Sequence, residues 1–145
     1  MRNELFKNLI VYEIYPTSFY DSNNDGVGDL KGIQEKLPYI KELGCNALWI
    51  NPFFTSPFKD GGYDVKDFFN VDPMFGTLED FDNLVKASER LGIKIIIDLV
   101  AGHASEEHPL FIKSGEETRN EYSDLFIWND CVWHLEDGYK FVSGR

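Results

Sequence analysis

The feature that most constrains the fold of this chain is an almost unbroken apolar run at residues 93–100. Its β-branched composition predicts a strand that is buried on both faces, as in a parallel sheet covered by helices. Asp98 lies inside the run and His103 lies just beyond it. Because a carboxylate and an imidazole are costly to bury unless they are paired or used, either these side chains are structural partners or they form a site at the C-terminal end of a strand.

Upstream of this run, strand-like and helix-like segments alternate. Further strands are predicted at residues 9–15 and 47–52. A helix is predicted at residues 29–43, where Gly44 supplies the stop and Pro38 predicts a kink or an earlier end. The apolar residues of this helix repeat at intervals of three and four: Leu30, Ile33, Leu37, Ile40 and Leu43.

A second helix is predicted to begin after Thr77, which forms a variant capping box with Asp80 in the place usually taken by Glu or Gln. Gly92 closes it. The apolar residues on one face are Phe81, Leu84, Val85 and Leu91.

The resulting order, β-α-β-α-β, predicts an α/β fold with a parallel sheet, because crossover connections are right-handed. Residues 109–145 lack a clear period and are interpreted as an excursion inserted after the third strand. Three strands leave such a sheet incomplete, since a closed barrel of parallel strands needs eight strands and roughly 250 residues. An unpaired strand edge and a bare inner face predict self-association of the isolated chain.

Composition narrows the classes of partner. The formal net charge is −11, which argues against nucleic-acid backbones and anionic membrane surfaces. No apolar stretch approaches the ~20 residues of a membrane helix, and the first residues do not read as a signal peptide. Cys45 and Cys131 form no disulfide framework, and Cys45 is expected to be a buried thiol. A cytoplasmic protein is predicted.

Five motifs occur in an order and spacing that are together far more specific than any one of them. They are Tyr12-Glu-Ile-Tyr-Pro16, Ala47-Leu-Trp-Ile-Asn-Pro52, Gly62-Tyr-Asp64, Val71-Asp-Pro-Met-Phe-Gly-Thr-Leu-Glu-Asp-Phe81 and Asp98-Leu-Val-Ala-Gly-His103. With them, the chain resembles the N-terminal part of the α-amylase family of glycoside hydrolases, in its oligo-1,6-glucosidase and trehalose-synthase branch. The resemblance implies a (β/α)8 TIM barrel: residues 1–104 would be its N-terminal part, and residues 105–145 the start of a small domain inserted after strand 3.

The family resemblance also implies a retaining mechanism that uses an Asp nucleophile and a Glu acid/base. Both residues follow the fourth and fifth strands of the family's barrel, so no catalytic residue is assigned in this chain. The resemblance makes His103 a residue that hydrogen-bonds hydroxyls of the sugar ring, Tyr63 the stacking platform of that ring and Asp60 an acceptor for hydroxyls at the non-reducing end. Asp98 is expected to be buried and to orient the site. The structural alternatives are core packing for Tyr63 and a turn role for Asp60.

A cation site is predicted at residues 21–29, where oxygen-bearing side chains alternate and Gly26 permits a sharp turn. Ca²⁺ prefers such clustered oxygens, and Mg²⁺ is the alternative ion. An EF-hand is rejected, since Gly32 stands where a bidentate Glu is needed; a solvated turn is the structural alternative. The expected ligands are Asp21, Asn23, Asp25, Val27 (through its carbonyl) and Asp29. A second calcium site, known in many α-amylases, is doubtful here because Gly102 replaces an Asn ligand.

The leading hypothesis is the N-terminal fragment of a retaining α-glucosidase-type enzyme that cleaves or transfers α-glucosidic linkages. Its partners would be an α-linked oligosaccharide or α-glucoside and the remainder of the barrel. Two alternatives stay open: a non-catalytic partial barrel that binds sugar or a partner, and one chain of a split glycosidase.

Overall fold

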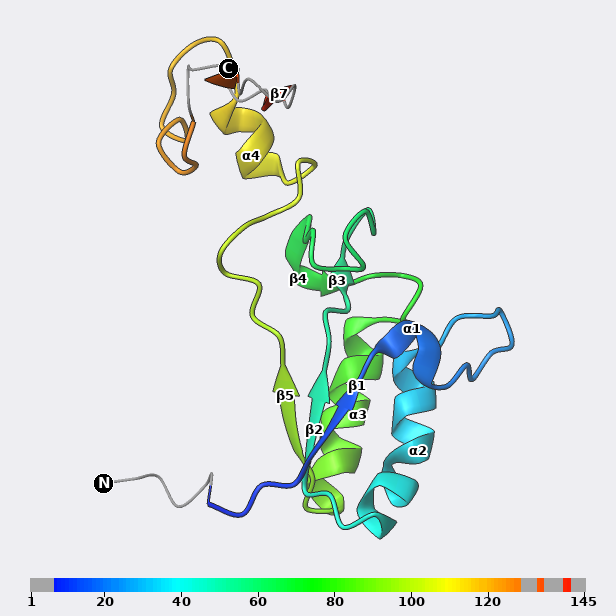
Figure 1. Ribbon diagram of the computed structural model, residues 1–145. Coiled ribbons are helices and arrows are strands. Elements are labelled where there is room, and N and C mark those ends of the chain that lie inside the picture. Colours follow the sequence, from blue (N-terminus) through cyan, green and yellow to red (C-terminus); the bar gives the residue numbers. More distant parts are fainter. Residues whose placement is uncertain (1–6, 129–132, 135–139, 142–145) are drawn as a thin grey trace.

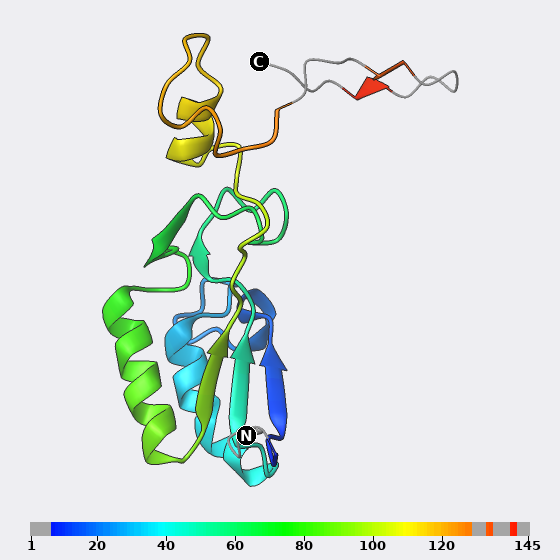
Figure 2. The same ribbon diagram turned by 90° about the vertical axis from the view of Figure 1, so that its left-hand side faces the viewer.

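The computed structural model describes residues 7–128, 133–134 and 140–141. A three-stranded parallel sheet carries two helices on one face, and Figures 1 and 2 show both helices on the same side of the strands. The strand order is β1-β2-β5, with Ala47 aligned between Val11 and Lys94. These elements are β1 (Val11–Ile14), α2 (Leu30–Glu42), β2 (Ala47–Ile50), α3 (Leu78–Arg90) and β5 (Lys94–Ile97). The predicted β-α-β-α-β order and parallel sheet are confirmed.

Smaller elements gather beyond the C-terminal end of the sheet. An antiparallel hairpin pairs β3 with β4 and lies between the sheet and helix α4 (Figure 2). The sequence reasoning missed this hairpin, because its first strand is only two residues long and carries no periodic signal. The remaining elements are α1 (Pro16–Phe19), β3 (Phe54–Thr55), β4 (Asp67–Val71), α4 (Pro109–Ser114), β6 (Trp133–His134) and β7 (Lys140–Phe141).

Helix α2 follows the predicted pattern of caps and apolar residues. Asp29 is its N-cap and accepts a hydrogen bond from the backbone N–H of Gly32, while Gly44 takes the left-handed φ of +84° just after the helix. The helix runs through Pro38 to Glu42, so the alternative prediction that it would end before Pro38 was wrong. Pro38 removes one backbone hydrogen bond, but the helix persists because it buries Leu30, Ile33, Leu37 and Ile40.

Helix α3 begins at the predicted capping box, which is confirmed. The Thr77 hydroxyl accepts a hydrogen bond from the Asp80 N–H, and the Asp80 carboxylate accepts one from the Thr77 N–H at 2.9 Å. Leu84 is fully buried on the inner face. Gly92 adopts a φ of +68° and ends the helix as expected.

The core lies between the sheet and the two helices. Each fully buried Leu or Ile there contributes roughly 1.5–3 kcal/mol relative to exposure. Cys45 lies at the edge of this core as a buried thiol, as predicted, whereas Cys131 falls outside the described residues. The central members are Ile14, Ile33, Leu37, Ile40, Leu48, Ile50 and Leu84.

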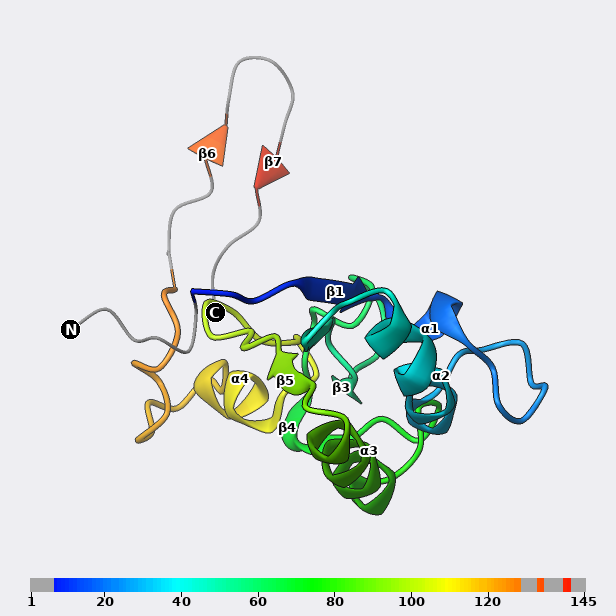
Figure 3. The same ribbon diagram turned by 90° about the horizontal axis from the view of Figure 1, so that it is seen from below.

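The prediction that the third strand is buried on both faces was wrong. Ile97 is 42% exposed and Leu99 is 80% exposed. The cause is that β5 lies at the edge of the sheet and that α2 and α3 cover one face only. In Figure 3, seen from below, both helices lie on the same side of β1 and β5. Asp98 is likewise half-buried rather than buried. In the described part of the chain, no helix is long and apolar enough to cross a membrane.

Candidate functional site

The site is built around the Asp98 carboxylate, which follows β5 at the C-terminal end of the sheet. One carboxylate oxygen accepts a hydrogen bond from the Trp49 indole N–H, and the other accepts one from the Tyr63 hydroxyl, each at 2.8 Å. Trp49 lies on the neighbouring strand β2, and Tyr63 lies in the loop inside the β3–β4 hairpin. Asp98 therefore joins three elements that are far apart in the sequence.

Tyr63 is half-buried, with its hydroxyl directed to Asp98. Burial raises the pKa of the phenol to about 12, and the hydrogen bond to the Asp98 carboxylate and its negative charge add to this effect. The hydroxyl is thus kept protonated as a donor at every physiological pH. The ring is thus held at both its apolar body and its polar tip, as is usual for a partly buried tyrosine.

His103 lies against the same loop. Its Nε2 is 3.0 Å from the backbone carbonyl oxygen of Tyr63. Because a carbonyl oxygen can only accept, this contact requires the proton on Nε2. The imidazole is otherwise exposed. The structure therefore brings His103, Tyr63 and Asp98 together at the C-terminal end of the sheet.

Asp60 belongs to the loop but not to this hydrogen-bonded group. Its backbone N–H donates to Asp64, and its carbonyl accepts from the Tyr63 N–H at 3.0 Å. The residue is exposed, and among the described residues its carboxylate makes no hydrogen bond. The backbone of Asp60 therefore forms part of a turn, while its carboxylate faces solvent.

Two residues with a role in this geometry were missed by the sequence reasoning. Trp49 read as an ordinary strand aromatic, although its place next to the strand end is a signal for a site residue. Asp64 belongs to the Gly62-Tyr-Asp64 motif but was given no role. Its carboxylate accepts hydrogen bonds from the Ser56 hydroxyl and the backbone N–H groups of Lys59 and Asp60.

Charged contacts tie the hairpin loop to the segment that follows His103. Lys59 forms ion pairs with Glu106 and Glu107, and Lys66 pairs with Glu107 at 3.1 Å. The backbone N–H of Ser105 also donates to the Val65 carbonyl at 2.9 Å. Since exposed ion pairs contribute little individually, the buried backbone contact is the firmer link.

The predicted cation loop is stabilised by its own hydrogen bonds. The Asp21 carboxylate accepts from the backbone N–H groups of Asn24 and Gly26, and these bonds hold its pKa below the ordinary value, with the Gly26 bond contributing most. Asp25 accepts from the Asn23 side-chain amide at 2.9 Å. Two carboxylates and an amide thus meet in one turn.

Asp29 is oriented differently from the rest of the predicted ligand set. Its buried carboxylate accepts from the Gly32 N–H and from the Ser22 hydroxyl. Within the described residues, no group of three or more His, Cys, Asp or Glu side chains is arranged to hold a metal ion. The oxygen donors of Asp21, Asn23 and Asp25 fit a hard cation by their chemistry. Asp29 acts as the cap of α2 in this geometry.

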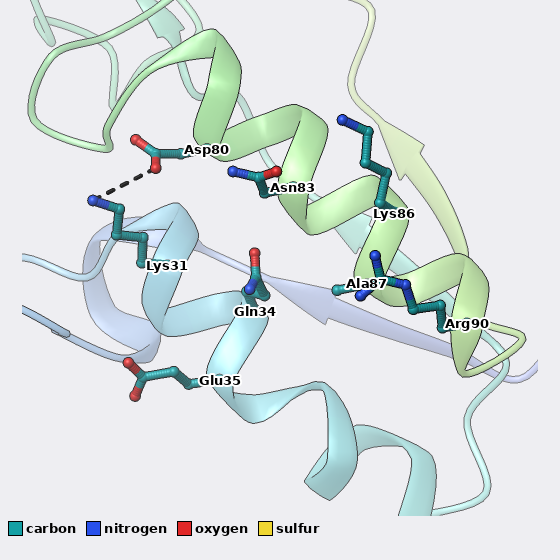
Figure 4. A pocket seen from close by; sticks show the side chains of 8 residues that line it. All are labelled: Lys31, Gln34, Glu35, Asp80, Asn83, Lys86, Ala87 and Arg90. Carbon is teal, nitrogen blue, oxygen red and sulfur yellow. Dashed lines mark ion pairs between the residues drawn. The ribbon is translucent and has the colours of Figure 1, made fainter.

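Two grooves differ in their position and in the chemistry of their lining. One, of about 360 Å³, runs between α2 and α3 and is lined by polar side chains such as Gln34, Asn83 and Arg90, with the Lys31–Asp80 ion pair at one end (Figure 4). The other, of about 580 Å³, is largely apolar and includes His103. The second groove lies beyond the C-terminal end of the strands and shares His103 with the candidate site, while Tyr63 and Asp98 are outside its lining.

Known proteins are similar in sequence to this chain over most of its length. The family "Alpha amylase, catalytic domain" matches residues 13–138. The chain is 50% identical over 125 residues to a probable α-glucosidase of Rhizobium meliloti, covering 86% of this chain and 23% of that protein. It is 49% identical over 127 residues to an oligo-1,6-glucosidase of Heyndrickxia coagulans, with coverages of 88% and 23%.

Solved structures agree with the sequence relatives. The trehalose-6-phosphate hydrolase of Bacillus licheniformis superposes with a TM-score of 0.85 at 44% identity, over 88% of this chain and 23% of that one. The chain thus spans about a quarter of the length of these relatives. Its three-stranded sheet with two covering helices is part of a (β/α)8 barrel. The chain belongs to the α-amylase family and contains part of that family's catalytic domain.

Proposed function

We propose that this chain supplies the N-terminal part of a retaining enzyme that cleaves or transfers α-linked glucosyl units. The observation that carries the proposal is the Asp98 carboxylate, which fixes Tyr63 beside His103 at the C-terminal end of the strands. The names of the relatives, α-glucosidase and oligo-1,6-glucosidase, support the same class of substrate. The protein would act in the cytoplasm, in keeping with a buried Cys45 thiol.

Each site residue has a role that follows from its contacts. Tyr63 would present its ring face to the sugar, because the bond from its hydroxyl to Asp98 holds the ring in one orientation. His103 would contact a sugar hydroxyl through Nδ1, since Nε2 is engaged with the Tyr63 carbonyl. The exposed Asp60 carboxylate would accept hydrogen bonds from hydroxyls at the non-reducing end. These contacts would strengthen as the ring distorts toward an oxocarbenium ion.

The reaction would need two catalytic carboxylates. In the family these follow the fourth and fifth strands of the barrel, which lie outside the three parallel strands of this chain. In retaining glycosidases one carboxylate is the nucleophile and the other the acid/base, about 5–5.5 Å apart. The remainder of the barrel would therefore be the partner that completes the site, and residues 1–145 alone would bind the sugar weakly and not turn it over.

The loop at residues 21–29 would hold a structural Ca²⁺ through the oxygens of Asp21, Asn23 and Asp25 and the Val27 carbonyl. Asp29, the fifth expected ligand, would have to leave the Ser22 hydroxyl or the Gly32 N–H to join them. The ion would neutralise adjacent carboxylates and stiffen the connection between β1 and α2. The loop lies between α1 and α2 and contains no residue of the Asp98 group, so the ion would stabilise the fold rather than take part in the reaction.

The proposal is tested with the complete polypeptide that carries residues 1–145, using 4-nitrophenyl α-glucoside as substrate. Tyr63→Ala is expected to lower kcat/KM by about 100-fold, the scale of a lost positioning contact. Tyr39→Ala, an exposed tyrosine on α2, is the matched control and should retain activity. Activity that survives Tyr63→Ala would contradict the assigned role. Glucoside binding without turnover would favour the non-catalytic partial barrel, and turnover only with a second chain would favour a split glycosidase.

A further inference from the structure

The loop that carries Asp60 and Tyr63 has an unusual backbone conformation, with three residues at positive φ. Phe58, Gly61 and Gly62 all have left-handed φ values, of 56°, 60° and 98°. A non-glycine residue in this region is strained, and such strain persists only where the surroundings over-determine it. A Cβ on Gly62 would also lie 3.1 Å from the Pro52 carbonyl oxygen. The loop is therefore a built structure rather than a flexible connection.

The group that determines this loop is the half-buried Asp64 carboxylate. Its Oδ1 accepts from the Ser56 hydroxyl at 2.8 Å and the Asp60 N–H at 3.1 Å, and its Oδ2 accepts from the Lys59 N–H at 2.9 Å. Ser56 in turn accepts from the N–H of Phe58. The N-terminal half of the strained turn thus converges on one side chain.

Contacts on the outside of the loop then fix its position in the fold. The Tyr15 hydroxyl, which follows β1, donates to the Gly61 carbonyl at 2.7 Å. Val65, next to Asp64, is fully buried and accepts from the Ser105 N–H through its carbonyl. Asp64 therefore stands between a buried anchor and the two residues that face the candidate sugar site.

We propose that Asp64 is a positioning residue, which sets the placement of Asp60 and Tyr63 for sugar binding without touching the sugar. This inference rests on the proposed function. An ionised carboxylate is required because two oxygens must accept at once. Asp64→Asn replaces one acceptor with an N–H₂ donor, which would face either the Lys59 N–H or the pair formed by Ser56 and Asp60.

The carboxylate is well suited to remain ionised. Burial raises its pKa, but the hydrogen bonds from Ser56, Lys59 and Asp60 outweigh burial and hold the pKa below the ordinary value. The loop geometry is therefore expected to persist across the pH range in which a glucosidase would work.

The first test compares Asp64→Asn with Asp67→Asn in the complete polypeptide that carries this chain. Asp67 is the matched control, because it accepts from the Phe69 N–H and the Asn70 amide in the same hairpin but outside the loop. With 4-nitrophenyl α-glucoside, Asp64→Asn is expected to lower kcat/KM by about 10–100-fold, with an increase in KM. Asp67→Asn should change neither constant. A loss of thermal stability in Asp64→Asn with unchanged kcat and KM would overturn the proposal.

The second test does not depend on catalysis. The Tyr63 phenol is titrated by NMR after ¹³C labelling of tyrosine, with its signal identified by Tyr63→Phe. In the unaltered chain Tyr63 should stay protonated at pH 11, since its pKa is about 12. In Asp64→Asn the pKa should fall toward 10, because the phenol leaves Asp98 and becomes exposed, whereas in Asp67→Asn it should not move. An unmoved Tyr63 pKa in Asp64→Asn would refute the positioning role. Absence of any glucosidase activity would refute only the proposed function.

Discussion

Asp98 shows how one side chain can organise a site from separate elements. Its two oxygens accept from Trp49 on β2 and from Tyr63 in the hairpin loop, so each oxygen is held by a neighbouring side chain. A carboxylate engaged in this way orients neighbours and lowers the cost of its own partial burial. The contrast with Asp60 is direct, because the Asp60 carboxylate is exposed and free to meet a ligand.

A residue-level prediction concerns the acid sensitivity of Asp80. Burial raises the pKa of Asp80, but hydrogen bonds from the Thr77 hydroxyl and N–H and the charge of Lys31 hold it below the ordinary value. A carboxylate whose pKa is depressed in the folded state adds stability above the unfolded-state pKa of about 3.9 and loses it as pH falls through the folded pKa. Stability from the capping box is therefore expected to be complete above about pH 5 and to decline below about pH 4.

The measurement is urea unfolding of Asp80→Ala, followed by tryptophan fluorescence at dilute concentration. At pH 7 the variant should lose about 1 kcal/mol, the typical contribution of a cap, and the loss should shrink in acid. Asp82→Ala, an exposed position on the same helix, is the control. An equal loss for Asp80→Ala at pH 7 and pH 3 would show that the ionised carboxylate is not what stabilises the helix start.

At the scale of elements, the connections at the C-terminal end of the sheet are built more elaborately than the helices they join. Helices α2 and α3 need only caps and an apolar face. The loop between β3 and β4 needs three left-handed residues, the Asp64 carboxylate and a buried Val65. Such over-determined loops are where binding residues are held by a rigid scaffold.

The loop between α1 and α2 carries the element-level prediction of a bound cation. Calcium at a hundredfold excess over its dissociation constant is expected to stabilise the folded chain by about 2.7 kcal/mol. The effect should be absent in Asp25→Ala and retained in Asp82→Ala, with the melting temperature measured in Ca²⁺ and in chelator. An equal calcium response of Asp25→Ala and the unaltered chain would place the ion elsewhere.

At the scale of the whole molecule, the uncovered face of the sheet dominates. On this face Val11 is 43% exposed and Trp49 is 37% exposed, and beyond the strand ends Leu99 and the hairpin residue Phe69 are 80% and 86% exposed. In a (β/α)8 barrel that face meets the other strands. Apolar surface of this extent on an isolated chain favours association, and the outer edge of β5 offers unpaired backbone groups.

Light scattering at micromolar concentration checks this prediction on the isolated 145-residue chain. The expected mass is well above the 16.7 kDa of one copy, and it should fall toward that value when the remainder of the barrel is supplied as a second polypeptide. A 16.7 kDa particle that unfolds cooperatively would show that the exposed face is tolerated in a monomer.

The order of elements, the glycine stops after α2 and α3 and the capping box of α3 could be read from the sequence alone, and the family resemblance assigned Tyr63, Asp98 and His103 to one site. Those features depend on local signals, such as the Thr77–Asp80 box and the apolar spacing of α2, or on motifs shared with a family. Only the tertiary structure decided that Trp49 donates to Asp98, that Asp64 gathers Ser56, Lys59 and Asp60, and that one face of β5 is open. The physical reason is range: caps and periodicity act within one turn or one strand, whereas these contacts join residues whose separation along the chain carries no pattern.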